Sequence, residues 1–297
     1  MAQACLLLGV DFSSAPTVRK PIVVARGRRE GAAVRLEAID GLPTLTAFER
    51  LLAQPGPWFG AFDFPFGLPR AFVAAQALGA STAAVIAALH ARCPERMAFR
   101  ALVDAWSRDR PAGRRLVHRA TDRAHEAIST SPLQTRYVPV GFMYYEGLAR
   151  LVAAGVTLPG LLAGDPARLA VEGYPARLAH RLIGRRSYKN GGERARLVAR
   201  HGLLGALEQD AGALGLALRL APAQRKAIAA DAGGDRIDAV LCLMQAAWAE
   251  RQPGCGVPAD VDPVEGWIVG PAAGGAGRAV GPSARRRRRL GAQASGR

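Results

Sequence analysis

Acidic residues stand at several points where apolar runs of this sequence end. They are Asp11 in GVDFSSAP, Asp63 in GAFDFPFGLP, Glu172 in VEGYPA, and Asp235 and Asp238 in GGDRIDAVL. Burying an unpaired carboxylate is costly, so acids flanked this closely by apolar residues indicate a function. If these carboxylates converge, some will hold protons at neutral pH unless a cation offsets their charge.

Magnesium suits such a group, because it is a hard cation that prefers oxygen ligands and keeps water molecules in its shell. Two such ions about 4 Å apart can activate a water and stabilise the leaving oxygen of a phosphodiester. We therefore expect Mg²⁺, or Mn²⁺ in its place, and hydrolysis of nucleic acid. The expected metal ligands are Asp11, Asp63, Glu172 and Asp238. The expected catalytic residues are Asp11, Glu172, Asp235 and Asp238.

Each acid also has a local explanation. Asp235 could cap the N-terminus of a helix whose dipole the second acid of the pair complements. Asp11 and Asp63 could each brace a turn, and Glu172 could pair with an arginine such as Arg177. What favours a shared site is the order of the acids along the predicted strands.

The first part of the chain predicts the elements that would hold Asp11 and Asp63. Apolar runs indicate strands at Cys5–Phe12, Ile22–Ala25 and Ala33–Ile39, and a later one at Trp58–Phe64. The first three are joined by short turns and must form an antiparallel meander, because parallel strands need a long crossover. The apolar spacing in Leu45–Gln54 predicts a helix before the fourth strand.

The rest of the chain is predicted to be mostly helical. A helical insertion is expected at about residues 68–160, ahead of a fifth strand at Leu169–Gly173 and a possible edge strand at Glu265–Val269. Helices are expected at Ala71–Leu78, Ala83–Ala91, Arg96–Trp106, Ala120–Ile128, Met143–Ala154, Pro175–Ile183, Arg194–Leu207, Ala221–Ala230 and Ile237–Glu250. Residues 271–297 are rich in Gly, Ala and Arg without periodicity and are expected to be disordered.

Composition indicates a basic protein without a membrane segment. The formal charge is +16; seven arginines and no acid follow Pro271, which leaves +9 for the remainder. Such a charge suits a nucleic-acid partner, although heavy arginine usage can also reflect genomic composition. No apolar run reaches the roughly 18 residues of a membrane span. The four scattered cysteines form no metal or disulfide pattern, which predicts a cytoplasmic location.

Six segments, taken in order, resemble one protein family. They are GVDFSSAP, FDFPFGLP, VEGYPA, SYKNG, DRIDAVLC and EGWIVGP. They are similar to the predicted nucleases with a ribonuclease H-like fold catalogued as domain of unknown function 429. The resemblance covers about residues 5–270. It implies an α/β fold with a mixed sheet, flanking helices and a helical insertion in a domain of residues 1–270.

The resemblance also implies roles for the acids. The wider superfamily, which includes Holliday-junction resolvases, uses an aspartate on the first strand, a carboxylate on a later strand and a DxxD pair on a late helix. By position these fall on Asp11, on either Glu172 or Asp63, and on Asp235 with Asp238. The resemblance implies nuclease activity as a property predicted for the family.

Four further groups could contact a nucleic acid, and each has a second explanation. Arg119 could grip phosphate or form an i, i+3 ion pair with Asp122. Lys189 in SYKNGGER could face a scissile phosphate or lie in a solvated loop. The aromatics of GFMYYEG could stack on bases or fill a core. The run Arg285–Arg289 could bind nucleic acid or be merely solvated.

Two other functions compete with a nuclease. An actin-like, nucleotide-dependent phosphotransferase would share this strand order but would place glycine-rich phosphate loops after the first strand and near the last helix. Ser13 and Ser14 stand where such glycines are expected, whereas Gly233 and Gly234 suit that alternative. A non-catalytic nucleic-acid-binding protein of the same fold is the third hypothesis.

Overall fold

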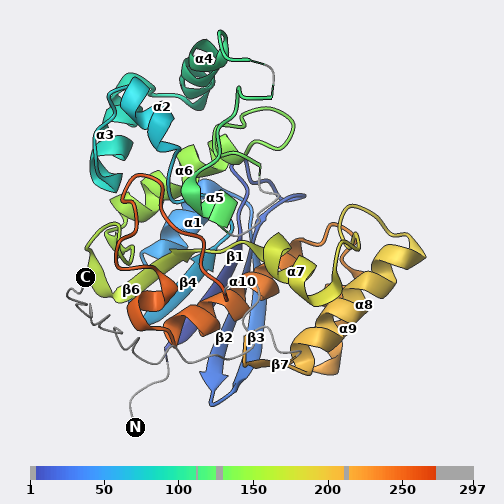
Figure 1. Ribbon diagram of the computed structural model, residues 1–297. Helices are drawn as coiled ribbons and strands as arrows, with labels where there is room; N and C mark the ends of the chain where they lie inside the picture. Colours follow the sequence, from blue (N-terminus) through green and yellow to red (C-terminus); the bar gives the residue numbers. More distant parts are fainter. Residues whose placement is uncertain (1–4, 112, 125–129, 211–213, 272–297) are drawn as a thin grey trace, which may run out of the picture.

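Seven strands form one mixed sheet in the computed structural model, which describes residues 5–111, 113–124, 130–210 and 214–271 (Figure 1). The strands are β1 (Leu6–Asp11), β2 (Ile22–Glu30), β3 (Ala33–Leu42), β4 (Trp58–Phe62), β5 (Val156–Thr157), β6 (Asp165–Glu172) and β7 (Ala217–Arg219). Their order across the sheet is β5-β6-β4-β1-β2-β3-β7.

The strand directions confirm the predicted meander. β1, β2 and β3 pair antiparallel in sequence, and β4 then joins the other side of β1 in parallel. The parallel step is possible because helix α1 (Leu45–Leu52) supplies the long connection that parallel strands require. β6 extends the sheet parallel to β4. The ends of β1, β4 and β6 therefore lie along one edge.

Ten α-helices surround this sheet in the described part of the chain. Besides α1 they are α2 (Arg70–Ala75), α3 (Thr82–Arg92), α4 (Arg96–Ser107), α5 (Ala120–Ala124), α6 (Val140–Ala153), α7 (Pro175–Ile183), α8 (Arg194–Glu208), α9 (Pro222–Ala230) and α10 (Asp235–Glu250); a short 3-10 turn follows at Pro253–Gly256. Five helices, α2 to α6, lie between β4 and β6, where the sequence predicted a helical block.

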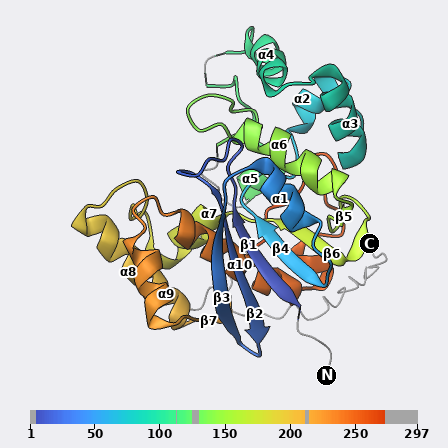
Figure 2. The ribbon, with the colours of Figure 1, turned by 180° about the vertical axis from the view of Figure 1, so that it is seen from behind.

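Helices cover both faces of the sheet. α10 lies across one face, with α7, α8 and α9 beside it (Figure 1). α1 and α6 cover the opposite face, as the view from behind shows (Figure 2). Alternate strand residues supply the two cores: Leu7 faces α10, whereas Leu8 and Val10 face α1 and α6.

The contact between α10 and β1 is unusually close because Gly9 has no side chain. A Cβ atom at Gly9 would overlap with the Ala239 carbonyl oxygen and the Leu243 amide nitrogen. Gly9 is in register with Ala25 on β2 and with Ala61 on β4. Three small residues thus form a row on which the backbone of α10 rests.

The two edges of the sheet differ from the prediction. The sequence missed β5 and β7, which have two and three residues. β7 pairs with the first three residues of β3, and the Gln224 amide donates to the carbonyls of Leu36 and Glu37 just beyond them. The edge strand predicted at Glu265–Val269 is wrong as a strand, since its backbone makes only a single bridge from Ile268 to Glu172.

Several other predictions concern residues that the structure does not describe. The Arg285–Arg289 run and the disorder expected at residues 272–297 lie outside the described residues, as does the last part of the helix predicted at Ala120–Ile128. All four cysteines are free. Within residues 5–271, gaps excepted, no helix is long and apolar enough to cross a membrane.

Candidate metal centre

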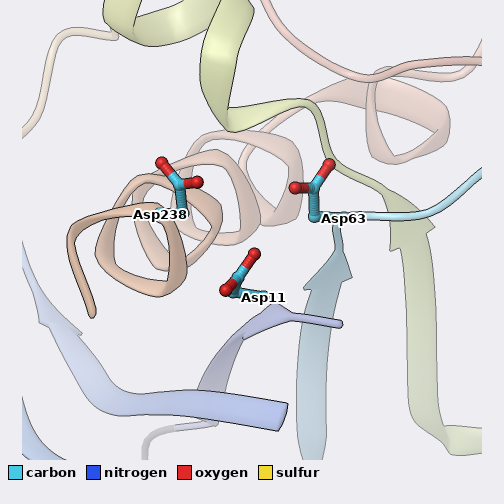
Figure 3. A group of neighbouring side chains, drawn as sticks. All are labelled: Asp11, Asp63 and Asp238. Carbon is cyan, nitrogen blue, oxygen red and sulfur yellow. The ribbon is translucent and has the colours of Figure 1, made fainter. Parts of the chain in front are cut away.

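Three aspartates converge at the edge of the sheet where β1 and β4 end. Asp11, Asp63 and Asp238 each offer a carboxylate oxygen, and these three oxygens lie within 4.8 Å of one another (Figure 3). Asp11 and Asp63 are partly buried, and Asp238 is 1% exposed. Oxygens at this spacing could hold a metal ion between them. We call these three residues the acidic triad.

Strand register and helix position bring the triad together. Val10 pairs with Phe62 across the parallel strands β1 and β4, so the next residues, Asp11 and Asp63, are neighbours. The Asp63 amide donates to the Val10 carbonyl at 2.9 Å and continues the ladder past the end of β4. The close seating of α10 then brings Asp238, in the first turn of the helix, over the same edge.

Burial and mutual repulsion disfavour the charged forms of these carboxylates. Burial, followed by the charges of Asp63 and Asp235, holds the pKa of Asp11 well above its usual value. Burial raises the pKa of Asp63 to about 6, and Glu172 adds to the effect. In the described part of the chain, no hydrogen-bond donor or ion-pair partner reaches the carboxylate of Asp11 or Asp63. A bound dication would reverse this penalty.

Two positive charges of the protein oppose that repulsion. The Lys189 ammonium pairs with Asp238 Oδ2 and lowers the pKa values of Asp11 and Asp63. Lys20, in the loop between β1 and β2, acts in the same direction on Asp11. The structure therefore places Lys189 beside the triad, where its ammonium contacts an aspartate.

Glu172 is not part of the triad, so the structure does not support the metal-ligand and catalytic roles predicted for it. Its Oε1 accepts from Arg119 Nη2 at 2.6 Å, and its Oε2 accepts from Arg119 Nη1 at 2.8 Å and the Phe66 amide at 2.9 Å. Both oxygens thus face the buried Arg119 guanidinium, and Glu172 is not among the acids whose oxygens lie within 4.8 Å of one another. The structure favours Asp63 over Glu172 as the second strand-end carboxylate. Glu172 does pair with an arginine, but that residue is Arg119 rather than Arg177.

Arg119 is likewise unable to grip a substrate. The side chain is buried and divides its donors between Glu172 and Asp122, with one further bond to the Glu265 carbonyl. The i, i+3 ion pair with Asp122 is confirmed. Arg119 instead joins the start of α5 to the end of β6, which fixes the helical block next to the site.

Asp235 occupies the first position of α10, and the capping role considered for it is wrong. Gly234 is the N-cap, in a left-handed conformation at φ 87°. The side chain of Asp231 serves the helix start instead, with Oδ2 accepting from the Arg236 amide at 2.9 Å. Asp235 lies outside the triad; the structure gives it an electrostatic influence on Asp11, not a ligand position.

Two residues beside the triad have interactions there that the sequence did not predict. The Tyr188 hydroxyl donates to Asp238 Oδ1 at 2.7 Å. The positive charge of Lys20 lowers the pKa of Asp11. A usable signal for Lys20 was the rarity of lysine, since two of only three lysines in the chain lie near the triad. The aromatics of GFMYYEG, Phe142, Tyr144 and Tyr145, are buried in the core, so base stacking is excluded for them.

The fold and site together define a mixed α/β protein with an acidic cluster that could bind a metal ion. The model of the protein family described as "Protein of unknown function (DUF429)" matches residues 9–262. The chain belongs to this family. No curated protein and no solved structure matches it.

Proposed function

We propose that this protein is a divalent-metal-dependent nuclease with a ribonuclease H-like fold. The observation that carries the proposal is the acidic triad: three aspartates from β1, β4 and α10 present oxygens within 4.8 Å of one another. Two of them lack any donor in the described chain. Oxygen ligands of this kind fit Mg²⁺ or Mn²⁺.

The strand order supports the fold assignment. An antiparallel meander, a helix and then parallel strands on the far side of β1 is the arrangement expected of ribonuclease H-like proteins. The triad also takes the positions that such proteins use: the first strand, a later strand and the last long helix. Gly234, which had favoured a nucleotide-binding loop, is accounted for by the packing of the Lys189 side chain against it.

The residues of the site would have two roles, metal binding and attraction of the phosphate backbone. Asp11, Asp63 and Asp238 would hold the cation at the strand ends. The bound cation would polarise the phosphodiester and lower the pKa of a coordinated water. Lys20 and Lys189 would attract the phosphate backbone, which the basic charge of the whole protein would also favour.

Loss of one triad carboxylate is the direct test. Asp11→Asn keeps the size of the side chain but removes the charge. It should lower Mg²⁺- or Mn²⁺-dependent cleavage roughly a hundredfold or more, since metal-ion catalysis contributes several kcal/mol. Cleavage would be measured on branched DNA, single-stranded DNA and an RNA–DNA hybrid.

The exposed Asp260 provides a matched control. Asp260→Asn should cleave like the wild type. Cleavage that survives Asp11→Asn unchanged, or that persists in EDTA, would exclude this mechanism. Stabilisation by ATP without cleavage of any substrate would favour the phosphotransferase hypothesis. Nucleic-acid binding that depends on salt but is unchanged by EDTA would favour a non-catalytic binding protein.

A further inference from the structure

Both oxygens of Asp238 already have partners. Oδ1 accepts the Tyr188 hydroxyl at 2.7 Å, and Oδ2 pairs with the Lys189 ammonium. A dication that uses Asp238 must therefore compete with the ammonium at Oδ2, because two positive charges at one oxygen repel each other. Metal binding and the Lys189 ion pair are in conflict.

Hydrogen bonds hold the backbone around Lys189 in place, so a backbone movement cannot separate its ammonium from Asp238. Arg200, itself buried, donates to the Tyr188 carbonyl at 2.8 Å and to the Ala229 carbonyl at 2.7 Å. The Asn190 and Gly191 amides donate to carbonyls of the loop that leads into α10. The main chain around Lys189 is thus tied to α8, to α9 and to the start of α10.

The side chain of Lys189, in contrast, packs at its stem but reaches solvent. Its stem lies against Gly234, where a Cβ atom would come within 2.9 Å of Lys189 Cγ. The side chain is 32% exposed although its partner Asp238 is buried. Its ammonium can therefore reach solvent through rotations about the four-carbon stem, without any change in the backbone.

We propose that Lys189 is a mobile counter-ion of the acidic triad. Its ammonium neutralises the triad before a divalent cation binds and turns outward to meet a phosphate of the nucleic acid once the cation is in place. This inference rests on the proposed function and gives Lys189 a second role there, in which it couples metal binding to substrate binding. Tyr188 is a positioning residue that keeps Oδ1 of Asp238 fixed during the exchange.

Lysine reactivity tests the movement, because the chain has only three lysines. The full-length protein would be labelled briefly with an amine-reactive ester, in EDTA or in saturating Mn²⁺, and each lysine read by peptide mass spectrometry. We expect Mn²⁺ to raise the labelling rate of Lys189 several-fold. Lys226, exposed on α9, is the internal control and should not change.

A second measurement follows the competition itself. Lys189→Met should bind Mn²⁺ on the order of tenfold more tightly than the wild type in calorimetry, because the competing charge is gone. Lys226→Met should bind Mn²⁺ as the wild type does. In Asp11→Asn, whose metal site is damaged, Mn²⁺ should leave the labelling of Lys189 low.

The outcomes separate this inference from the proposed function. Binding of Mn²⁺ that is lost in Asp11→Asn, with no change in Lys189 labelling, would overturn the mobile counter-ion and leave the nuclease proposal standing. No binding of Mn²⁺ to the wild type at millimolar concentration would overturn both.

Discussion

The carboxylates of the triad differ in what surrounds them, although all three are aspartates. Asp238 has a hydroxyl and an ammonium as partners, whereas Asp11 and Asp63 face each other without a donor in the described chain. Burial and repulsion therefore act most on Asp11 and Asp63. These two side chains are where proton binding and metal binding compete.

The raised pKa of Asp63 predicts a pH dependence with a definite sign. Its pKa is about 6 in the folded protein and near 3.8 in the unfolded chain, so the folded state binds this proton more tightly. The stability due to the proton is present below about pH 4 and is lost as the pH rises through 6. The loss is on the order of 3 kcal/mol. In EDTA, the protein should therefore melt at a lower temperature at pH 7.5 than at pH 5.

A bound metal ion should oppose this fall in melting temperature at higher pH. Mn²⁺ should raise the melting temperature at pH 7.5 more than at pH 5, because at pH 5 a proton on Asp63 competes with the metal. The side chain introduced by Asp63→Asn cannot titrate, so the melting temperature of this variant in EDTA should fall less between pH 5 and pH 7.5. A melting temperature that rises steadily from pH 5 to pH 7.5 in EDTA, equally in both proteins, would contradict the assignment of a raised pKa to Asp63.

At the level of the elements, the position of α10 depends on a single missing side chain. Gly9→Ala would place a methyl group inside the backbone of α10 and force the helix away from β1. Overpacking of this kind should lower the free energy of unfolding by about 3 kcal/mol. It should also weaken Mn²⁺ binding, because Asp238 moves with the helix. Urea unfolding and calorimetry would measure the two effects.

Gly202→Ala is the matched control, since nothing lies within 4 Å of a Cβ atom there and the residue is within helix α8. Alanine is the better helix former, so this change should be neutral or stabilising by up to about 1 kcal/mol. Equal losses of stability in the two variants would mean that the close contact of α10 with β1 does not matter for the fold.

The sequence predicted the elements better than the contacts between them. Long apolar periods located α10 and the first four strands, but β5 and β7 are too short to show any alternation. The choice between Asp63 and Glu172 was open because both end neighbouring strands. The structure favours Asp63, because Arg119, which lies 53 residues before Glu172 in the chain, pairs with the Glu172 carboxylate. Ion pairs between such distant residues leave no local pattern in a single sequence.

For the whole molecule, Arg119 links parts of the chain that are far apart in sequence. Its guanidinium joins α5 to Glu172 on β6 and to the carbonyl of Glu265. The Glu265 side chain in turn accepts from the amides of Arg70 and Ala120, at the starts of α2 and α5. The helical block, the sheet and the C-terminal described segment are thus connected through two buried charged residues.

Removal of Arg119 should therefore be far more damaging than removal of a surface arginine. Arg119→Ala would leave Glu172 and Asp122 buried without their partner and should cost about 3–5 kcal/mol in urea unfolding. Arg136, whose ion pair with Asp104 is exposed (54% and 41%), is the control. Arg136→Ala should cost no more than about 1 kcal/mol. Similar losses for both variants would contradict the central role of the Arg119 network.

The very short strands at the two ends of the sheet affect how this protein meets its neighbours in solution. An open strand edge is a template on which another chain can add a strand and begin to aggregate. Here β5 offers two residues, and β7 with the Gln224 amide covers the outer side of β3 from Ala33 to Glu37. Addition of a strand from another chain is therefore disfavoured at β5 and along the first half of β3.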